Sequence, residues 1–80
     1  MVEQRVRAVI AAVFGIAPGE LPERASPETV AGWSSLRQVR IMLALEQEFG
    51  VEIDPNLIPA LTSDGAMTAF VADLVAENAA

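Results

Sequence analysis

The sequence predicts an all-α fold: a small bundle of three main helices and one short helix, with a long loop after the first helix. Three segments of the 80-residue chain repeat apolar residues at spacings of three and four, which is the period of an amphipathic helix. Proline and glycine gather between these segments, and no stretch has a pattern that predicts a strand. Eighty residues make one domain at most, so residues 1–80 are expected to form a single domain.

The first helix is expected to end near Gly15. Its apolar residues fall on one stripe, which should face the core: Val2, Val6, Val9, Ile10, Val13 and Phe14. The following residues, 17–32, include three prolines and two glycines among polar residues, which predicts a long ordered loop. Four apolar residues could anchor this loop to the core, namely Ile16, Leu21, Val30 and Trp33.

The second helix is expected from about Ser35 to Phe49, with Gly50 as the glycine that ends it. Asp54 and Pro55 are a cap and first-turn signal for a short third helix, which Pro59 must distort or end. The apolar members of this short helix are Leu57, Ile58 and Leu61. A last helix is expected from Gly65 to about Glu77. Its candidate caps are Thr62, Ser63 and Asp64, and its apolar residues are Met67, Phe70, Val71, Leu74 and Val75.

The composition argues against an enzyme that acts alone. The chain has no cysteine, histidine, lysine or tyrosine, and therefore lacks most of the side chains that perform acid-base or nucleophilic catalysis near neutral pH. Without cysteine and histidine it also lacks disulfides and the usual zinc ligands, so no metal site is predicted. Helix packing must supply the stability of the fold.

The charge is acidic and unevenly distributed. The formal net charge is -6, which argues against binding to a nucleic-acid backbone, because such binding needs clustered Lys and Arg. All five arginines lie in the first half of the chain, whereas residues 41–80 hold seven acids and no base. A partner of the second half is therefore expected to be basic.

The first seventeen residues superficially resemble a secretion signal, since Arg5 and Arg7 precede an apolar run. Glu3 lies within the region that should be basic, and a core helix explains the same run better. No apolar stretch approaches the roughly 18 residues that a membrane span needs. We therefore expect a cytoplasmic protein that does not insert into membranes.

The second helix has apolar residues on two sides. At 100° per residue, Ile41, Met42, Leu45 and Phe49 gather on one arc, together with Gln38. Leu36, Val39 and Leu43 lie toward the opposite side, among polar residues. Two explanations remain open at this point: the long loop covers Leu36 and Leu43, or these residues form an exposed patch that recognises partners.

Ser34 and Ser35 stand together at the start of this helix, where only one N-cap residue is needed. If Ser34 is the cap, Ser35 is the first helical residue, and its hydroxyl lies free at the positive end of the helix dipole, where a phosphate would be stabilised. Alternatively, Ser35 and Gln38 match a capping box. The serine chemistry alone does not choose between these assignments.

In this region the sequence resembles the acyl carrier proteins and, more broadly, the phosphopantetheine-dependent carrier domains. The family has Asp-Ser-Leu at the start of its second helix, then Leu-Glu-x-x-Phe and a nearby Ile. This chain reads Ser34-Ser35-Leu36, then Leu45-Glu46-Gln47-Glu48-Phe49, with Ile53 four residues later. The resemblance covers nearly the whole length and implies an acyl-carrier-like four-helix bundle.

The resemblance implies that Ser35 carries a 4'-phosphopantetheine arm, which a phosphopantetheinyl transferase takes from coenzyme A. The thiol of the arm would hold an acyl or aminoacyl thioester, which explains how a chain without cysteine or catalytic residues could work. The implied partners are the transferase, an acyl- or aminoacyl-loading ligase or transferase, and synthases or other enzymes that use the cargo. By the same resemblance, Leu36 and Leu43 contact partner enzymes, and Glu46 and Ile53 lie on the same side. The whole expected recognition surface is Leu36, Arg37, Val39, Arg40, Leu43, Glu46, Gln47 and Ile53.

Three departures from the family pattern affect these expectations. Ser34 replaces the aspartate before the modified serine, which keeps the cap but loses a charge. Arg37 and Arg40 stand where many members carry acids, which favours a dedicated pathway over general fatty-acid synthesis. The loop before Ser34 lacks the Leu-Gly-Gly pattern of many peptidyl carriers, which favours an acyl carrier.

The interpretation that follows is a free-standing, monomeric acyl carrier of a specialised fatty-acid, polyketide or related pathway. An aminoacyl or peptidyl carrier of a nonribosomal-peptide-like system is the first alternative. The second alternative is an unmodified helical interaction module whose Leu36 and Leu43 bind a second copy or another protein.

Overall fold

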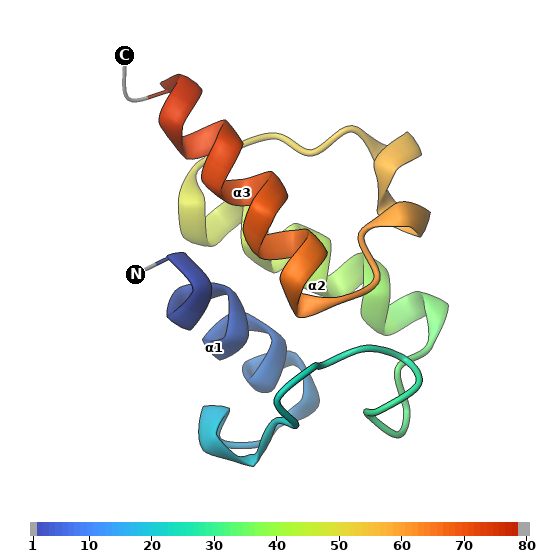
Figure 1. Cartoon of the computed structure of the whole chain (residues 1–80). Coiled ribbons are helices and arrows are strands. Elements are labelled where there is room, and N and C mark those ends of the chain that lie inside the picture. Colours follow the sequence, from blue (N-terminus) through green and yellow to red (C-terminus); the bar gives the residue numbers. More distant parts are fainter. Residues whose placement is uncertain (1, 79–80) are drawn as a thin grey trace.

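The computed structural model describes residues 2–78 and is helical, as the sequence predicts. Its main helices are α1 (Val2–Phe14), α2 (Ser35–Phe49) and α3 (Asp64–Asn78). The short helices η1 (Pro18–Glu20) and η2 (Pro55–Ala60) are of the 3₁₀ type. Figure 1 shows α1 beside α2 and α3, with the long loop below the bundle and η2 at its side. The prediction of an acyl-carrier-like helical bundle is confirmed.

The helix ends follow the local signals in the sequence. Gly15 and Gly50 adopt the left-handed conformation, with φ of 70° and 64°, and each lets the chain leave a helix while its amide still bonds to the last turn. At the start of α3, Ser63 Oγ accepts a hydrogen bond from the Ala66 N–H at 3.1 Å, so Ser63 is the cap among the three candidates. Asp54 caps η2 by accepting from the Asn56 N–H at 2.9 Å.

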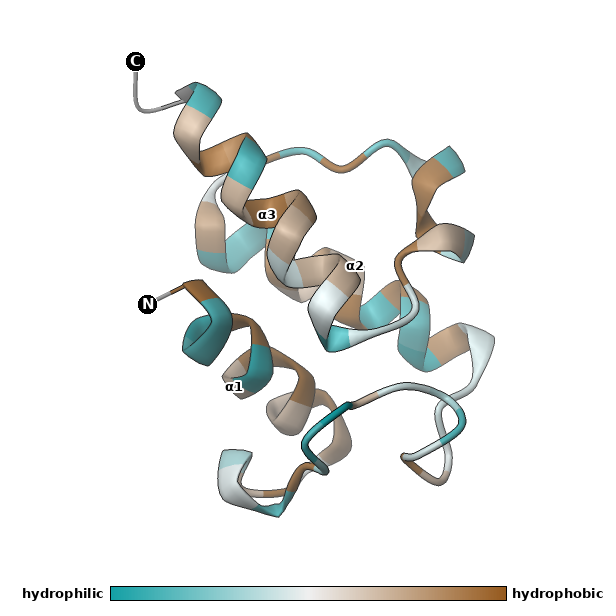
Figure 2. Cartoon of the chain, in the orientation of Figure 1, coloured by the Kyte–Doolittle hydropathy of each residue, from teal (hydrophilic) through white to brown (hydrophobic). Residues whose placement is uncertain are grey.

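The core lies where the three main helices meet. The largest side chains that are almost completely enclosed are Val6, Ile10, Ile41, Met42, Leu45, Met67 and Val71. Figure 2 shows the brown, apolar stretches of α1 and α3 along their length. Because α1 packs against both α2 and α3, its apolar stripe forms the centre of the bundle.

The long loop is ordered and packed, as predicted, although it contains the single helical turn η1, which the sequence analysis did not predict. Of its four predicted anchors, Leu21 is buried and the other three are partly buried against the core. Ala25 is a further anchor, fully buried, whose small size hid it from a search for large apolar residues. It pairs with the start of α3, since the Ala25 carbonyl accepts from the Asp64 N–H at 3.0 Å.

A charged cluster fixes the same loop to α1 and α3. Arg7 forms an ion pair with Asp64 and donates a 2.7 Å hydrogen bond to the Pro22 carbonyl. The other Asp64 oxygen accepts from the Ala25 N–H at 3.2 Å. Both side chains are largely buried, with 18% of Arg7 and 11% of Asp64 exposed. Local sequence patterns do not predict this pair, because its partners are 57 residues apart.

Candidate functional site

The site begins at the N-terminus of α2, where the two serines have different environments. Ser34 has an extended backbone, and its Oγ accepts a hydrogen bond from the Arg37 N–H at 3.2 Å. Ser34 is therefore the N-cap, as the first of the two assignments proposed. The alternative capping box between Ser35 and Gln38 does not form, because the Gln38 amide is used elsewhere.

Ser35 is the first residue of α2 and is exposed. Within residues 2–78, no hydrogen bond occupies its hydroxyl. The backbone N–H groups of the first helical turn lie next to it, so the local field stabilises a negatively charged group attached at this oxygen. The hydroxyl can therefore be reached from outside, and a phosphate bonded to it would be favourably placed.

A largely apolar groove of about 360 Å³ runs beside Ser35. Trp33 and Val39 form part of its wall on the α2 side, and Ile58 and Pro59 of η2 contribute to the opposite side. Its remaining lining residues are Pro27, Ser34, Gln38 and Thr62. A flexible group bonded to Ser35 would have this groove as its nearest apolar surface.

Gln38 holds the walls of this groove together. Its Oε1 accepts a 2.7 Å hydrogen bond from the Trp33 indole, and its Nε2 donates to the carbonyls of Ile58 and Leu61 at 2.9 and 2.6 Å. Only 7% of Gln38 is exposed, so these bonds satisfy a buried amide. This role of Gln38 was not predicted from the sequence. The signal was a glutamine on the buried arc of the helix, where a polar side chain needs partners.

Away from the core, α2 carries the apolar residues that the periodicity set apart, and one of them, Val39, also lines the groove. Leu36 is 61% exposed, Leu43 54% and Val39 41%. The explanation that the long loop covers Leu36 and Leu43 is therefore wrong. We call these three residues the apolar strip.

The other residues of the expected recognition surface differ in how far they are exposed. Ile53 lines a shallow groove together with Leu43 and Glu46, on the side where it was expected, but it is only 6% exposed and belongs to the core. The sequence contains a signal for the burial of Ile53, namely the alternation of apolar and acidic residues in Val51-Glu52-Ile53-Asp54. Such alternation is typical of an extended segment with one buried side. The Ile53 backbone N–H donates to the Glu46 carboxylate at 2.8 Å. Glu46 is half-buried, and its carboxylate is partly used within the fold.

The two arginines of α2 also differ. The Arg37 guanidinium lies 4.9 Å from the ring centre of Phe14, in a cation–π contact, and the Phe14 ring in turn contacts Trp33. Arg37 is therefore partly buried and packed onto the fold. Arg40 and Gln47 are exposed.

A comparison with protein-family models identifies the family. A model described as a phosphopantetheine attachment site matches residues 4–71, which is most of the chain. The chain belongs to this family of carriers. Its cofactor is 4'-phosphopantetheine, bound covalently, and carrier domains of this kind do not catalyse reactions themselves.

The site described above suits such a group chemically. The cofactor needs an accessible hydroxyl for its phosphate, and the carrier offers the exposed hydroxyl of Ser35 at a helix N-terminus. Carrier domains of the family interact with phosphopantetheinyl transferases and synthase enzymes. Within residues 2–78, no helix is long and apolar enough to cross a membrane.

Proposed function

We propose that the chain acts as a single acyl carrier domain in which Ser35 bears the 4'-phosphopantetheine arm. The observation that carries this proposal is the division of labour between the two serines. Ser34 caps α2 through its hydrogen bond to the Arg37 N–H, which leaves the adjacent Ser35 hydroxyl exposed for modification. When bound, the arm supplies a thiol that holds the cargo as a thioester.

The residues around Ser35 have separate tasks in this proposal. The first turn of α2 stabilises the negative charge of the phosphodiester. Gln38 and Trp33 keep η2 against α2 and so maintain the groove beside the arm. The apolar strip is the surface on which the transferase, the loading enzyme and the enzymes that use the cargo dock in turn.

The cargo is proposed to be an acyl group of a specialised biosynthetic pathway. Arg37 and Arg40 support this, because they interrupt the acidic second helix typical of the family. Loading assays with acyl-activating and amino-acid-activating enzymes distinguish this proposal from an aminoacyl or peptidyl carrier. Stable self-association of unmodified protein through the apolar strip would instead favour the interaction module.

The site assignment is tested by intact-mass measurement after incubation with coenzyme A and a broad-specificity transferase. The wild-type chain should gain one phosphopantetheinyl group. Ser35→Ala should gain none, whereas Ser34→Ala, the matched change at the neighbouring hydroxyl, should still be modified. An adduct that persists in Ser35→Ala would contradict the assignment.

A further inference from the structure

The arginines of the carrier fall into two groups. Three of them contact groups of the chain itself, namely Arg5, Arg7 and Arg37. Arg24 and Arg40 are exposed, and neither takes part in the two ion pairs formed within residues 2–78. Arg24 lies in the long loop, so Arg40 is the one arginine of this second group on α2.

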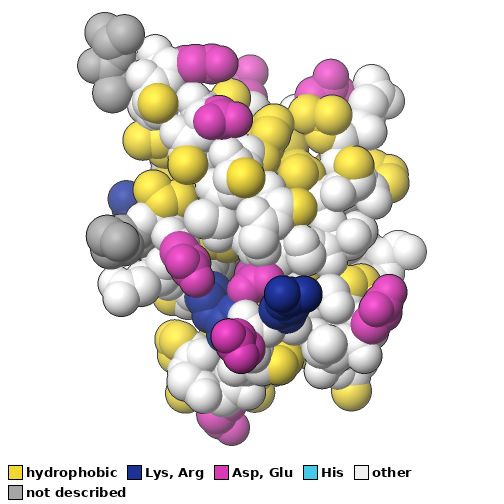
Figure 3. Space-filling view, viewed as in Figure 1, with side chains coloured by type: hydrophobic (Ala, Val, Ile, Leu, Met, Phe, Trp, Pro, Cys, Tyr) yellow, Lys and Arg dark blue, Asp and Glu magenta, His cyan; other side chains and the backbone are white. Residues whose placement is uncertain are grey.

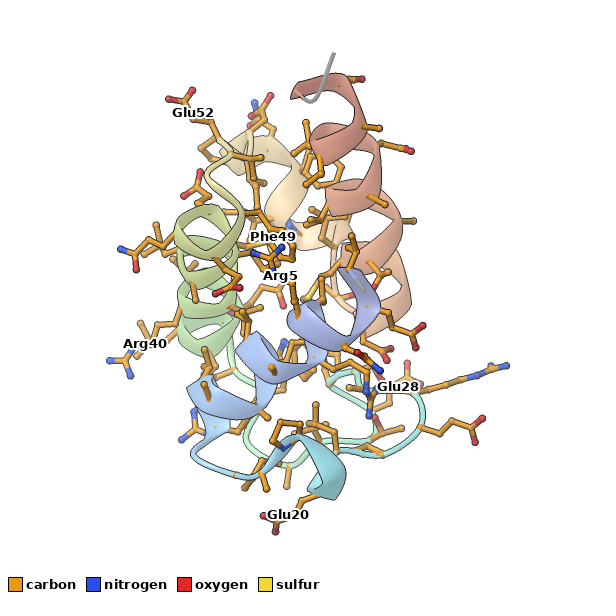
Figure 4. All side chains as sticks on the ribbon, turned by 90° about the vertical axis from the view of Figure 1, so that its left-hand side faces the viewer. Arg5, Glu20, Glu28, Arg40, Phe49 and Glu52 are labelled. Atoms are coloured by element: carbon orange, nitrogen blue, oxygen red, sulfur yellow. The ribbon has the colours of Figure 1, made fainter. Side chains whose placement is uncertain are left out.

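Arg40 lies within the apolar strip. It follows Leu36 by four residues and precedes Leu43 by three, so it is a neighbour of both on the helix surface. Figure 4 shows its side chain extending away from α1 and from the rest of the bundle. A partner that covers Leu36 and Leu43 must therefore also cover the guanidinium of Arg40.

Acidic groups gather at the other end of the same surface. Glu46 and Glu52 line a shallow groove of about 490 Å³ together with Leu43. Figure 4 shows Glu52 beyond the C-terminal end of α2, at the opposite end from Arg40. Figure 3 shows acidic and basic side chains close together on another face, and with a formal net charge of -6 an exposed arginine on α2 that forms no ion pair within residues 2–78 is unusual for this molecule. The surface is positive toward Ser35 and negative toward Glu52.

We infer that this surface fits a partner protein with the reverse arrangement: an acidic side chain opposite Arg40 and a basic side chain opposite Glu52. A partner with only basic groups would leave the Arg40 charge partly desolvated and facing a like charge, which disfavours the complex. Arg40 thus selects among partners by excluding uniformly basic docking faces. This inference rests on the proposed function, because the partners are those that act on Ser35.

The test uses a phosphopantetheinyl transferase whose docking face is basic, and measures kcat/KM for formation of the adduct. Arg40→Glu should raise kcat/KM about five- to tenfold, because a repulsive contact becomes attractive. Arg24→Glu is the matched control, since it changes the net charge equally from an exposed position outside α2. It should change kcat/KM by less than about twofold.

A second arm replaces the basic residues of the transferase docking face with glutamate, one at a time. At the residue opposite Arg40, the replacement should accelerate modification of the wild-type carrier and slow that of Arg40→Glu. Equal effects of Arg40→Glu and Arg24→Glu, or no transferase position that couples to residue 40, would overturn the inference while the proposed function stands. If no chain gains an adduct on Ser35, the proposed function itself fails.

Discussion

Two polar clusters hold the segments around the long loop, and they use different chemistry. The Arg7–Asp64 cluster is charged: the arginine pairs with the carboxylate and donates to the carbonyls of residues 21–23, and the carboxylate accepts from the Ala25 N–H. The Trp33–Gln38 cluster is neutral, and its amide also bonds to the carbonyls of Ile58 and Leu61.

The difference separates stability from function. Trp33 and Gln38 line the groove beside Ser35, whereas Arg7 and Asp64 do not. The carrier thus uses a buried ion pair where only the fold depends on it. It uses neutral hydrogen bonds next to the Ser35 hydroxyl, where a further fixed charge would alter the field at the residue that we propose is modified. Changes in the first cluster should affect stability alone, and changes in the second should affect both stability and modification.

The largest effect is expected for Arg7→Ala, which leaves the Asp64 carboxylate buried without its partner. We expect the free energy of unfolding to fall by about 3–5 kcal/mol, measured by urea denaturation. The matched control is Arg24→Ala, an exposed arginine of the long loop, which should change the free energy of unfolding by less than about 0.5 kcal/mol. The double variant Arg7→Ala/Asp64→Ala should regain part of the loss. A loss below about 1 kcal/mol in the single variant would contradict the role given to this pair.

A smaller effect is expected for Gln38→Ala, which removes three hydrogen bonds and leaves the partner groups unsatisfied. The free energy of unfolding should fall by about 2–3 kcal/mol in the same denaturation experiment. Unlike Arg7→Ala, this variant should also be modified more slowly at Ser35 under conditions where both are folded, because η2 is no longer tied to α2. Gln4→Ala removes an exposed amide from α1 and serves as the control. Equal rates of Ser35 modification in Gln38→Ala and Arg7→Ala would contradict the distinction between the two clusters.

The smallest effect is expected for Ser34→Ala, which removes the N-cap of α2. The expected loss of stability is about 1 kcal/mol, measured by thermal or urea denaturation. Ser34→Asp keeps a capping oxygen and adds a favourable charge at the helix start, so it should be at least as stable as the wild type. A stability of Ser34→Ala equal to that of the wild type would mean that the hydrogen bond to the Arg37 N–H contributes little.

The sequence predicted those features of the carrier that depend on near neighbours. Helical periodicity separated Ile41, Met42 and Leu45 from Leu36 and Leu43, and the structure has the first group buried and the second exposed. The ends of the helices were predicted to within a residue or two, because glycine and the capping side chains act over one turn. Which serine caps α2 depended on the environment of Gln38, and so needed the fold.

Contacts between distant segments could not be predicted in this way. The Gln38 amide finds partners 20 and 23 residues away, and nothing in the local sequence says that Arg37 should lie over Phe14 while Arg40 stays exposed. The burial of Ile53 has the same origin. The family resemblance indicated the side of the molecule on which Ile53 lies. Its burial depends on how the segment after α2 packs against the core.

Trp33 is the only tryptophan in the sequence, and it borders the groove beside Ser35. Its indole N–H is fixed by the Gln38 amide and its ring contacts Phe14, so its fluorescence reports on one defined place in the molecule. The carrier therefore contains an intrinsic optical probe next to the hydroxyl that we propose is modified. We expect arrival of the proposed arm and separation of η2 from α2 to change its emission, so both could be followed in real time without a label that would disturb docking.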